Sequence, residues 1–390
     1  MKEGRDVLLF VVDAGGGHRA AANALRAAGQ ATGAPLRFQV ANIQDVLAPL
    51  DLPRRLTGAS LEETYNGMVR RGWTRHLVPL LRAFQWTIRR LHRGLVDRIA
   101  ADLAARRPEV VVSLFPNFNA VLRDATRAAL PGVPFVVVLT DLADFPPHFW
   151  MEPGFDRVVV ATARAAAQAR ALGYDEGRIV RASGTPLHPR FYPAAGAGRR
   201  SRARAALGLD GEDFLVLLLF GGKGAPEMHG LAQALLRAHP GWHVVAVCGQ
   251  NPGLLARMEA LAATDGGRLR PLGFTDEVSE LMAAADVLVT KPGPGCLAEA
   301  FHQRVPTVVT ANARTIPQER YNATFLEEEG LGLVVKDWRQ VPDAVGTLFG
   351  WPTRRAEIRA RLRARPENRA VYEVLELLAS PALRPGPPSP

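Results

Sequence analysis

The chain has 390 residues, 47% of them hydrophobic, and a formal net charge of +10 at neutral pH. This length exceeds what one hydrophobic core usually supports, and the composition is ordinary for a globular protein, so two domains are expected. The chain has only two cysteines, Cys248 and Cys296, which excludes a disulfide framework and a cysteine metal site. It has no long uncharged apolar run, which excludes a membrane-spanning helix.

The first half of the chain alternates short apolar runs with longer helical patterns, which is typical of a parallel sheet flanked by helices. Residues 1–10 lead directly into the first apolar run, without the cleavage site of a signal peptide, so a cytoplasmic protein is expected. The predicted strands are Val7–Val12, Leu36–Asn42, Val110–Leu114, Phe135–Thr140 and Arg157–Ala161.

Residues 184–202 lose this periodicity and collect Gly, Pro and Arg, so we predict an interdomain linker there. The alternation then resumes, with predicted strands at Phe214–Phe220, Trp242–Cys248, Arg268–Leu272, Asp286–Thr290, Thr307–Thr310 and Gly332–Val334. We therefore predict an α/β protein with two doubly wound domains, residues 1–183 and 203–365. Residues 366–380 are expected to form a helix that returns to the first domain, and residues 381–390 a disordered tail.

Three consecutive glycines, Gly15, Gly16 and Gly17, follow the first predicted strand and precede an alanine-rich helix. They let the backbone approach a ligand, and the helix points its N–H groups at that ligand. His18 stands at the start of the helix, where the positive dipole end disfavours imidazolium, so a neutral side chain that accepts a proton is expected. The alternative is a tight turn without function; neither the dinucleotide nor the Walker pattern is matched.

Two loops in the second half have the same character. Gly221, Gly222 and Lys223 end one predicted strand and lead into a helix, with Pro226 expected in its first turn. Residues 291–295, which include Gly293 and Gly295, end another strand and precede a second helix. Because each loop offers backbone N–H groups to a phosphate, two of them in one domain indicate a phosphate-bearing ligand.

Residues 64–96 contain no acidic side chain. Arginine and apolar residues, tryptophan included, are mixed there at helix-like spacing, which is typical of a segment in a membrane interface. The residues that we assign to membrane binding are Arg82, Trp86, Arg89, Arg90 and Arg93. The alternative is a solvated helix that packs its Leu/Trp face on the first domain. The net charge decides nothing by itself, because arginine far outnumbers lysine throughout the chain, and no motif supports nucleic acid binding.

Several separated motifs carry a resemblance. They are residues 13–19 (DAGGGHR), Thr140 and Asp141 with His148 and Trp150, residues 273–276 (GFTD), residues 291–295 (KPGPG) with Glu299, and residues 316–319 (IPQE) with Asn322. In these motifs the chain resembles the monogalactosyldiacylglycerol synthase-like (processive diacylglycerol glycosyltransferase) family, which is related to the N-acetylglucosaminyltransferase of peptidoglycan-precursor synthesis.

The resemblance implies the GT-B fold, two facing Rossmann-like domains with the active site in the cleft between them. It also implies an inverting transfer of a hexose from a UDP-sugar to diacylglycerol, without a metal or other cofactor. His18 or Asp141 would take the acceptor's proton, with Gly15, Gly16, Gly17 and His148 at the acceptor side. The donor would contact Gly221, Gly222, Lys223, Phe274, Lys291, Gly293, Gly295, Glu299, Gln318, Glu319 and Asn322.

Within that set, Glu299 would hold the ribose, Phe274 would lie against the uracil, and Gln318 and Glu319 would bind the sugar. The expected partners are a UDP-sugar, a lipid acceptor and an anionic membrane, with the protein attached peripherally to the inner face of the cell membrane. Two other enzymes remain open: a UDP-N-acetylglucosamine transferase to an undecaprenyl-type carrier and a nucleotide-sugar epimerase of the same fold. A basic protein that only binds membranes or nucleic acid is the non-enzyme alternative.

Overall fold

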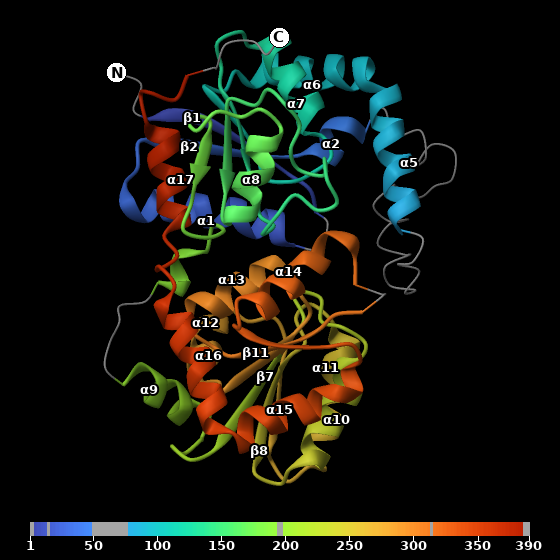
Figure 1. The fold of residues 1–390 in the computed structure, drawn as a ribbon, viewed down its shortest axis with the longest axis vertical. Helices are drawn as coiled ribbons and strands as arrows, with labels where there is room; N and C mark the ends of the chain where they lie inside the picture. Colours follow the sequence, from blue (N-terminus) through green and yellow to red (C-terminus); the bar gives the residue numbers. More distant parts are fainter. Residues whose placement is uncertain (1–3, 14–15, 49–76, 193–197, 313–314, 385–390) are drawn as a thin grey trace. The chain divides into compact units, whose positions relative to one another are not determined.

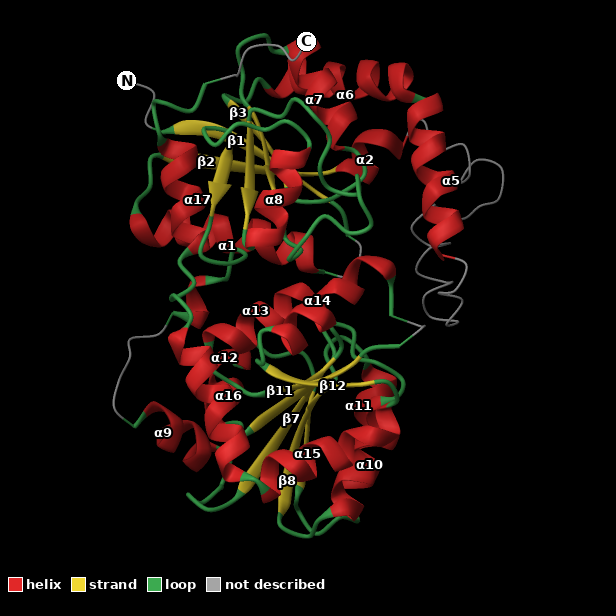
Figure 2. Cartoon of the chain, in the orientation of Figure 1, coloured by secondary structure: helices red, strands yellow, loops and turns green. Residues whose placement is uncertain are grey.

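The computed structural model describes residues 4–13, 16–48, 77–192, 198–312 and 315–384 (Figure 1). The chain divides into two compact units, and each contains one six-stranded sheet. The first unit comprises Met1–Pro189, Ile316–Tyr321 and Asn368–Pro390, and the second comprises Arg190–Thr315 and Asn322–Glu367. Helices lie on both faces of each sheet (Figure 2).

The sheet of the first unit is parallel throughout, with the strand order β2-β1-β3-β4-β5-β6. Its strands are β1 (Arg5–Val11), β2 (Leu36–Asn42), β3 (Val110–Ser113), β4 (Phe135–Val138), β5 (Arg157–Val160) and β6 (Ile179–Arg181). The central strands β3 and β4 are fully buried. Continuous runs of valine and phenylalanine form such strands because helices cover both faces of a parallel sheet.

The described helices of the first unit are α1 (Gly17–Thr32), α2 (Ile43–Leu47), α5 (Leu77–Arg90), α6 (His92–Arg106), α7 (Asn119–Ala129), α8 (Ala163–Ala171) and α17 (Ala370–Ala379). The C-terminal helix α17 packs against α1. A Cβ atom on Gly29 of α1 would lie 2.9 Å from the Phe38 ring and 3.8 Å from Leu375 of α17, so glycine permits this close packing. Arg5 also donates hydrogen bonds to the carbonyl oxygens of Leu378 and Ser380 at the end of α17.

The second unit repeats the architecture with the parallel order β12-β11-β10-β7-β8-β9. Its strands are β7 (Phe214–Leu219), β8 (Trp242–Val247), β9 (Leu269–Leu272), β10 (Val287–Thr290), β11 (Thr307–Thr310) and β12 (Gly332–Val335). Its described helices are α9 (Arg199–Ala206), α10 (Met228–Ala238), α11 (Pro252–Ala262), α12 (Val278–Ala284), α13 (Pro294–His302), α14 (Pro317–Glu328, whose first five residues group with the first unit), α15 (Val341–Gly350) and α16 (Pro352–Ala364). Short 3₁₀ helices cover Pro189–Phe191 and Trp338–Gln340.

Each sheet has one point at which the strand order reverses. In the first unit it lies between β1 and β3, and in the second it lies between β7 and β10. Open α/β sheets bind ligands at this point, beyond the carboxyl ends of the strands. The predicted loops that follow β1, β7 and β10 therefore lie where the topology favours ligand binding, and the predicted doubly wound α/β fold is confirmed.

Three local features differ from the sequence prediction. Strand β6 was not predicted, because only one of its three residues is buried and no apolar run marks it. The segment predicted as an irregular linker contains the first residues of α9, which packs against α12. Pro226 does not lie in a first turn, since α10 begins two residues later at Met228. Among the described residues, no helix is long and apolar enough to cross a membrane.

Candidate functional site

His18 is the second residue of α1, directly beyond the carboxyl end of β1. Gly16 caps the helix with a φ of 84°, a left-handed conformation that glycine adopts without strain. Gly17 begins the helix, and Gly15 lies outside the described residues. The predicted βα turn at the first switch point is therefore present where the structure describes it.

The His18 ring is half-buried and held from three sides. Its Nδ1 lies 3.3 Å from Thr140 Oγ1, and the ring also hydrogen-bonds the backbone of Leu114, which follows β3. The indole of Trp150 packs edge-on against it with 5.9 Å between ring centroids. Residues that follow three neighbouring strands thus meet at one imidazole.

This environment fixes the charge of His18. Burial lowers the pKa of the imidazole to about 4, and the hydrogen bond to Leu114 opposes that shift only in part. At neutral pH the ring is therefore a neutral base. The neutral imidazole that the sequence predicted is therefore present, but its cause differs. Desolvation by the surrounding protein lowers the pKa, whereas the sequence argument attributed the neutral state to the helix dipole.

Asp141 has a structural partner. Its carboxyl group is buried, and Oδ2 accepts a 2.7 Å hydrogen bond from Nε1 of Trp150, which is 1% exposed. Asp144 accepts hydrogen bonds from the backbone N–H groups of residues 148–151, at 2.6 to 3.4 Å. The two carboxylates together fix the position of Trp150, and through it the edge of the His18 ring.

His148 joins this group only through its backbone N–H, which donates to Asp144, and no contact among the described residues brings its side chain to His18. Its side chain is about half exposed, and its Nδ1 lies 3.7 Å from Glu152 Oε2. Its backbone has a φ of 62°, and its carbonyl oxygen accepts a 3.4 Å hydrogen bond from Gln85 of α5. The structure therefore places His148 at the surface of the first unit, next to α5.

In the second unit, the loop that follows β7 is fastened to the loop that follows β8. Gly221 has a φ of 81°, and the carbonyl oxygen of Gly222 accepts a 2.8 Å hydrogen bond from the N–H of Gln250. A Cβ atom on Gly249 would lie 2.4 Å from that oxygen, so the approach requires glycine. Lys223 is exposed at the tip of the loop. The backbone of this loop is thus held at its base, and the Lys223 side chain at its tip is exposed to solvent.

The loop that follows β10 leads into α13. Gly293 caps this helix and Pro294 is its first residue, a position where a missing N–H costs nothing. The fully buried Asn322 of α14 donates a 2.9 Å hydrogen bond to the carbonyl oxygen of Pro292. The Nδ2 of Asn322 therefore holds the loop, while its buried Oδ1 has no hydrogen-bond partner among the described residues. Lys291 and Gly295 are half-buried on either side of the cap.

Glu299 lies on α13 and is half-buried. Burial raises the pKa of its carboxyl group to about 7, against the attraction of Arg190. Phe274, in the loop that follows β9, is 60% exposed, which is unusual for a phenylalanine without a partner to cover it. Gln318 and Glu319 lie in the first turn of α14; Glu319 is buried and Gln318 half-buried.

The membrane-assigned residues lie on α5 and at the start of α6, while residues 64–76 of the predicted segment lie outside the described residues. The exposed positions are Arg82, Trp86, Arg89, Arg90 and Arg93, with Trp86 63% and Leu91 45% exposed. Ile88 is buried, and the Phe84 ring contacts Phe118. The helix therefore packs one apolar edge on its unit and leaves a tryptophan among arginines on the other.

The sequence analysis gave no role to two members of the His18 group, although it included Thr140 in a motif of the resemblance. Thr140 follows β4, and a search for polar side chains at the ends of strands near the switch point would find it. Leu114 acts through its backbone, which no sequence pattern reveals. Among the described residues, no cluster of His, Cys, Asp or Glu side chains is arranged to hold a metal ion.

In comparisons with known proteins, each unit matches a glycosyltransferase family model. Residues 18–187 match the model of the monogalactosyldiacylglycerol (MGDG) synthase family, and residues 216–345 match that of the glycosyltransferase family 28 C-terminal domain. Among curated relatives, the probable MGDG synthase 2, chloroplastic, of Oryza sativa subsp. japonica and MGDG synthase 2, chloroplastic, of Arabidopsis thaliana are each 28% identical. Each alignment covers 95% of this chain and 80% of the relative.

Solved structures share the fold. The UDP-GlcNAc 2-epimerase of Neisseria meningitidis bound to UDP-GlcNAc matches with a TM-score of 0.61 at 12% identity, covering 96% of this chain and 99% of that one. MurG of Acinetobacter baumannii matches with a TM-score of 0.58 at 14% identity, with the same coverage. One of these neighbours is an epimerase and both have the same architecture, so the fold alone does not decide between the reactions.

Proposed function

The chain belongs to the monogalactosyldiacylglycerol synthase family of GT-B glycosyltransferases, and on this premise we propose that it moves a hexose from a UDP-sugar to diacylglycerol, with inversion and without a catalytic metal. The observation that carries the proposal is the neutral, half-buried His18 at the switch point of the first sheet. A transferase needs a base at its acceptor, and this side chain has the protonation state that a base requires.

In the proposed reaction, His18 accepts the proton of the acceptor hydroxyl while that oxygen bonds to the anomeric carbon of the sugar. The bond between that carbon and the diphosphate oxygen breaks on the opposite face, so the configuration inverts and UDP leaves. The hydrogen bond to the Leu114 backbone stabilises the imidazolium that forms. Asp141 is the weaker candidate base, because its carboxylate is buried and already accepts the Trp150 hydrogen bond.

The leaving diphosphate is assigned to the N-terminus of α13. The first hydrogen bond across this helix start runs from Leu297 N–H to the Gly293 carbonyl, at 3.1 Å, so the N–H groups of Gly295 and Cys296 have no carbonyl one turn back to bond. These N–H groups and the helix dipole favour an anion there. This arrangement would perform the charge stabilisation that a divalent metal performs in other transferases.

Donor recognition is assigned by family resemblance. Glu299 would accept both ribose hydroxyl hydrogens, which requires the ionised carboxylate. The exposed Phe274 ring would cover the uracil, and Gln318 and Glu319 would bind the sugar hydroxyls. Exposure of Phe274 and burial of Glu299 support these roles, since a bound nucleotide would cover the first and pair the second.

We further propose that the protein attaches peripherally to an anionic membrane, on the inner face of the cell membrane, through α5 and the start of α6. Tryptophan at a bilayer interface buries an apolar ring while its N–H stays hydrated, and arginine binds the lipid phosphates. Trp86 is exposed and Arg90 lies over its ring at 6.0 Å from the centroid. Arg82 and Arg93 extend this exposed surface.

The test is a transfer assay. The purified chain is incubated with UDP-galactose, UDP-glucose or UDP-N-acetylglucosamine and with diacylglycerol vesicles, with and without EDTA, and lipid products are identified by mass spectrometry. A monohexosyl diacylglycerol formed equally in EDTA supports the proposal. Isomerisation of a UDP-sugar without lipid, or transfer to an undecaprenyl-type carrier only, would assign the protein to one of the two alternative reactions.

A further inference from the structure

Two helices of the second unit, α9 and α16, are strongly basic. Helix α9 carries four arginines and no acidic residue, and α16 carries five arginines and only Glu357. Each helix therefore has a formal charge of +4, in a chain whose net charge is +10. This charge lies outside the loops assigned to the donor and outside α5, so the proposed reaction does not explain it.

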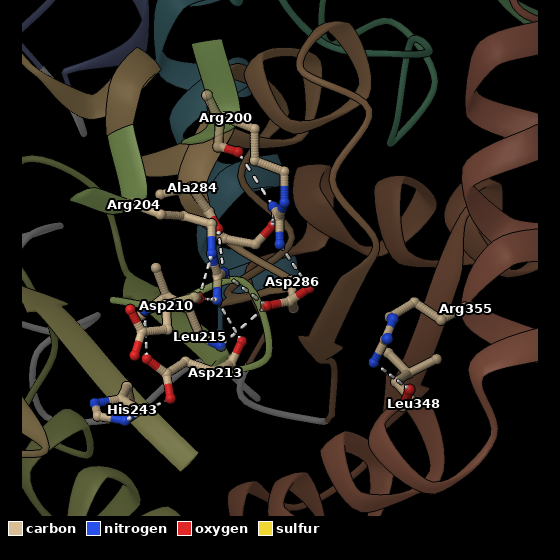
Figure 3. Close-up of polar contacts among 12 residues, drawn as sticks. Arg200, Arg204, Asp210, Asp213, Leu215, His243, Ala284, Asp286, Leu348 and Arg355 are labelled. Carbon is tan, nitrogen blue, oxygen red and sulfur yellow. Dashed lines mark hydrogen bonds and ion pairs between the residues drawn. The ribbon is translucent and has the colours of Figure 1, made fainter. Parts of the chain in front are cut away.

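The two helices converge on a single carboxylate, Asp286, which is buried. Its Oδ1 is 2.8 Å from Arg200 Nη2 of α9 and 3.5 Å from Arg359 Nη2 of α16. Its Oδ2 accepts hydrogen bonds from the N–H of Leu215 at 3.0 Å and from Arg204 at 3.3 Å. Figure 3 shows Arg200 and Arg204 pointing toward Asp286. One negative charge is therefore shared by three guanidinium groups.

The three arginines are not equivalent. Arg204 is 4% exposed; its Nη1 also donates to the carbonyl oxygen of Ala284, and its Nη2 donates to those of Asp210 and Asp213, so it is a structural residue (Figure 3). Arg200 and Arg359 have side chains that are 39% and 25% exposed. They can therefore reach a ligand at the surface while keeping a partly desolvated charge.

Arg359 uses little of its hydrogen-bonding capacity. Its Nη2 contacts Asp286 and the carbonyl oxygen of Ala285, each at 3.5 Å, and its Nε and Nη1 have no partner among the described residues. Burial and then repulsion from Arg200 lower the pKa of the Arg359 guanidinium. Because arginine stays protonated regardless, the pair keeps an uncompensated positive charge with donors to spare.

This cluster lies at the edge of the sheet opposite to the donor loop. Asp286 directly precedes β10, whereas Lys291 directly follows it. A strand of four residues spans about 13 Å, so one anion cannot occupy both ends. A ligand at Arg200 and Arg359 would be distinct from the donor diphosphate.

We propose that Arg200 and Arg359 form a second anion site in this unit, which binds a phosphate group between α9 and α16. A planar guanidinium matches two phosphate oxygens. Arg200 and Arg359 both reach Oδ1 of Asp286, so the two guanidinium groups are close enough to contact one phosphate, Arg359 with its Nε and Nη1 and Arg200 with the donors that its bonds to Ala283 and Ala285 leave. A phosphate from solution and the headgroup of an acidic phospholipid supply the same chemistry. The site goes beyond the proposed transfer reaction and does not depend on it.

The experiment measures binding of inorganic phosphate to the full chain by titration calorimetry, with UDP present and with chloride at matched ionic strength as reference. Arg359→Gln removes the charge and keeps the side-chain length. Arg354→Gln is the matched control, because Arg354 is exposed on the same helix and its side chain pairs, among the described residues, with Glu357 alone. Because the comparison is between two variants of α16, it is valid whether or not UDP occupies the donor loops.

We expect wild type and Arg354→Gln to bind phosphate equally, and Arg359→Gln to bind at least about tenfold more weakly. Arg200→Gln should show the same loss, and it decides the result if Arg359→Gln does not fold. Phosphate binding by wild type no stronger than chloride binding, or equal binding by wild type and Arg359→Gln, overturns the site. Flotation with phosphatidylcholine vesicles, with and without phosphatidic acid, then identifies the source: a selective loss in Arg359→Gln assigns the lipid headgroup, and no loss assigns soluble phosphate.

Discussion

As the proposed base, His18 must meet two requirements that oppose each other. Burial keeps the imidazole unprotonated at neutral pH, but a base with a pKa of about 4 has a weak tendency to take a proton. The contacts around the ring reduce this conflict, because the Leu114 backbone stabilises the protonated form and Thr140 can reorient its hydroxyl. The same contacts fix the plane of the imidazole ring, so the activation free energy of the proposed reaction need not include the cost of orienting it.

Replacing His18 by Ala is therefore expected to lower kcat by about 10²–10⁴-fold, with the KM for the UDP-sugar nearly unchanged. Asp141→Asn is the discriminating control, because the amide oxygen can still accept the Trp150 hydrogen bond, and kcat should fall by less than about tenfold. Steady-state kinetics with both variants checks this. An inactive Asp141→Asn beside an active His18→Ala would transfer the role of base to Asp141.

Whereas burial lowers the pKa of His18, it raises the pKa of the Glu299 carboxyl group. Its folded-state pKa of about 7 lies above the ordinary carboxyl value, so between those two values the folded chain binds more protons than the unfolded chain. The contribution of Glu299 to the free energy of unfolding therefore falls as pH rises through this window. A ligand that needs the carboxylate gains affinity over the same range.

We expect the affinity for a UDP-sugar to increase by about tenfold between about pH 6 and pH 8, as Glu299 ionises. Glu299→Gln should bind more weakly and lose this dependence, because the amide cannot ionise. Titration calorimetry with UDP-galactose measures both, since its diphosphate does not titrate in this range. A wild-type affinity that is flat across these pH values would remove Glu299 from the ribose contact.

At the scale of elements, the sequence predicts the strands that a continuous apolar run marks, and it misses elements that are defined by a few contacts with their neighbours. The runs of β4 and β7 are apolar throughout and that of β3 is apolar up to Ser113, and each strand was predicted within two residues of its observed bounds. Strand β6 has no such run and is defined by its pairing with β5. Helix α9 is so rich in arginine that it resembles a linker, and its ties to α12 and Asp286 were invisible before the fold placed them.

The loop before α13 depends on one such contact, and Asn322→Ala tests it. Removing the side chain leaves the buried Pro292 carbonyl unpaired, which should lower the free energy of unfolding by about 2 kcal/mol. The affinity for a UDP-sugar should fall as well, because the loop loses its support.

Asn312→Ala is the matched control: its Nδ2 donates to the carbonyl oxygen of Lys336 in the same way, but the side chain is exposed. Its cost should be about 1 kcal/mol or less, with donor affinity retained. Urea unfolding and calorimetry give both quantities. Equal effects of the two variants would show that Asn322 does not support the loop specifically.

At the scale of the whole molecule, topology explains why the sequence located the loops but not their ligands. Three glycine-containing loops were predicted from their positions after strands, and all follow strands that border the two switch points. Positions of this kind follow from the strand order alone. The roles within the loops depend on packing: Asn322 supports a loop, Asp141 holds Trp150, and His148 is at the surface.

The net charge of the whole molecule affects its binding to membranes. A chain of charge +10 is attracted to any anionic bilayer at low salt, so weak binding alone would not identify a specific surface. The α5 surface adds Trp86, which is 63% exposed and offers apolar burial that salt does not screen. We therefore expect vesicle binding to weaken as salt rises and to keep a residual part that depends on Trp86.

Arg82→Gln combined with Arg93→Gln should weaken binding to phosphatidylglycerol vesicles by about tenfold or more, at about 1 kcal/mol for each arginine. Arg237→Gln with Arg257→Gln removes the same charge from exposed positions on α10 and α11 and should have a much smaller effect. Trp86→Ala should abolish the part that resists salt. Co-sedimentation across a salt series measures these differences, and transfer to a short-chain acceptor in detergent should remain in every variant. Equal losses in the two arginine pairs would show that net charge, and not the α5 surface, brings the protein to the membrane.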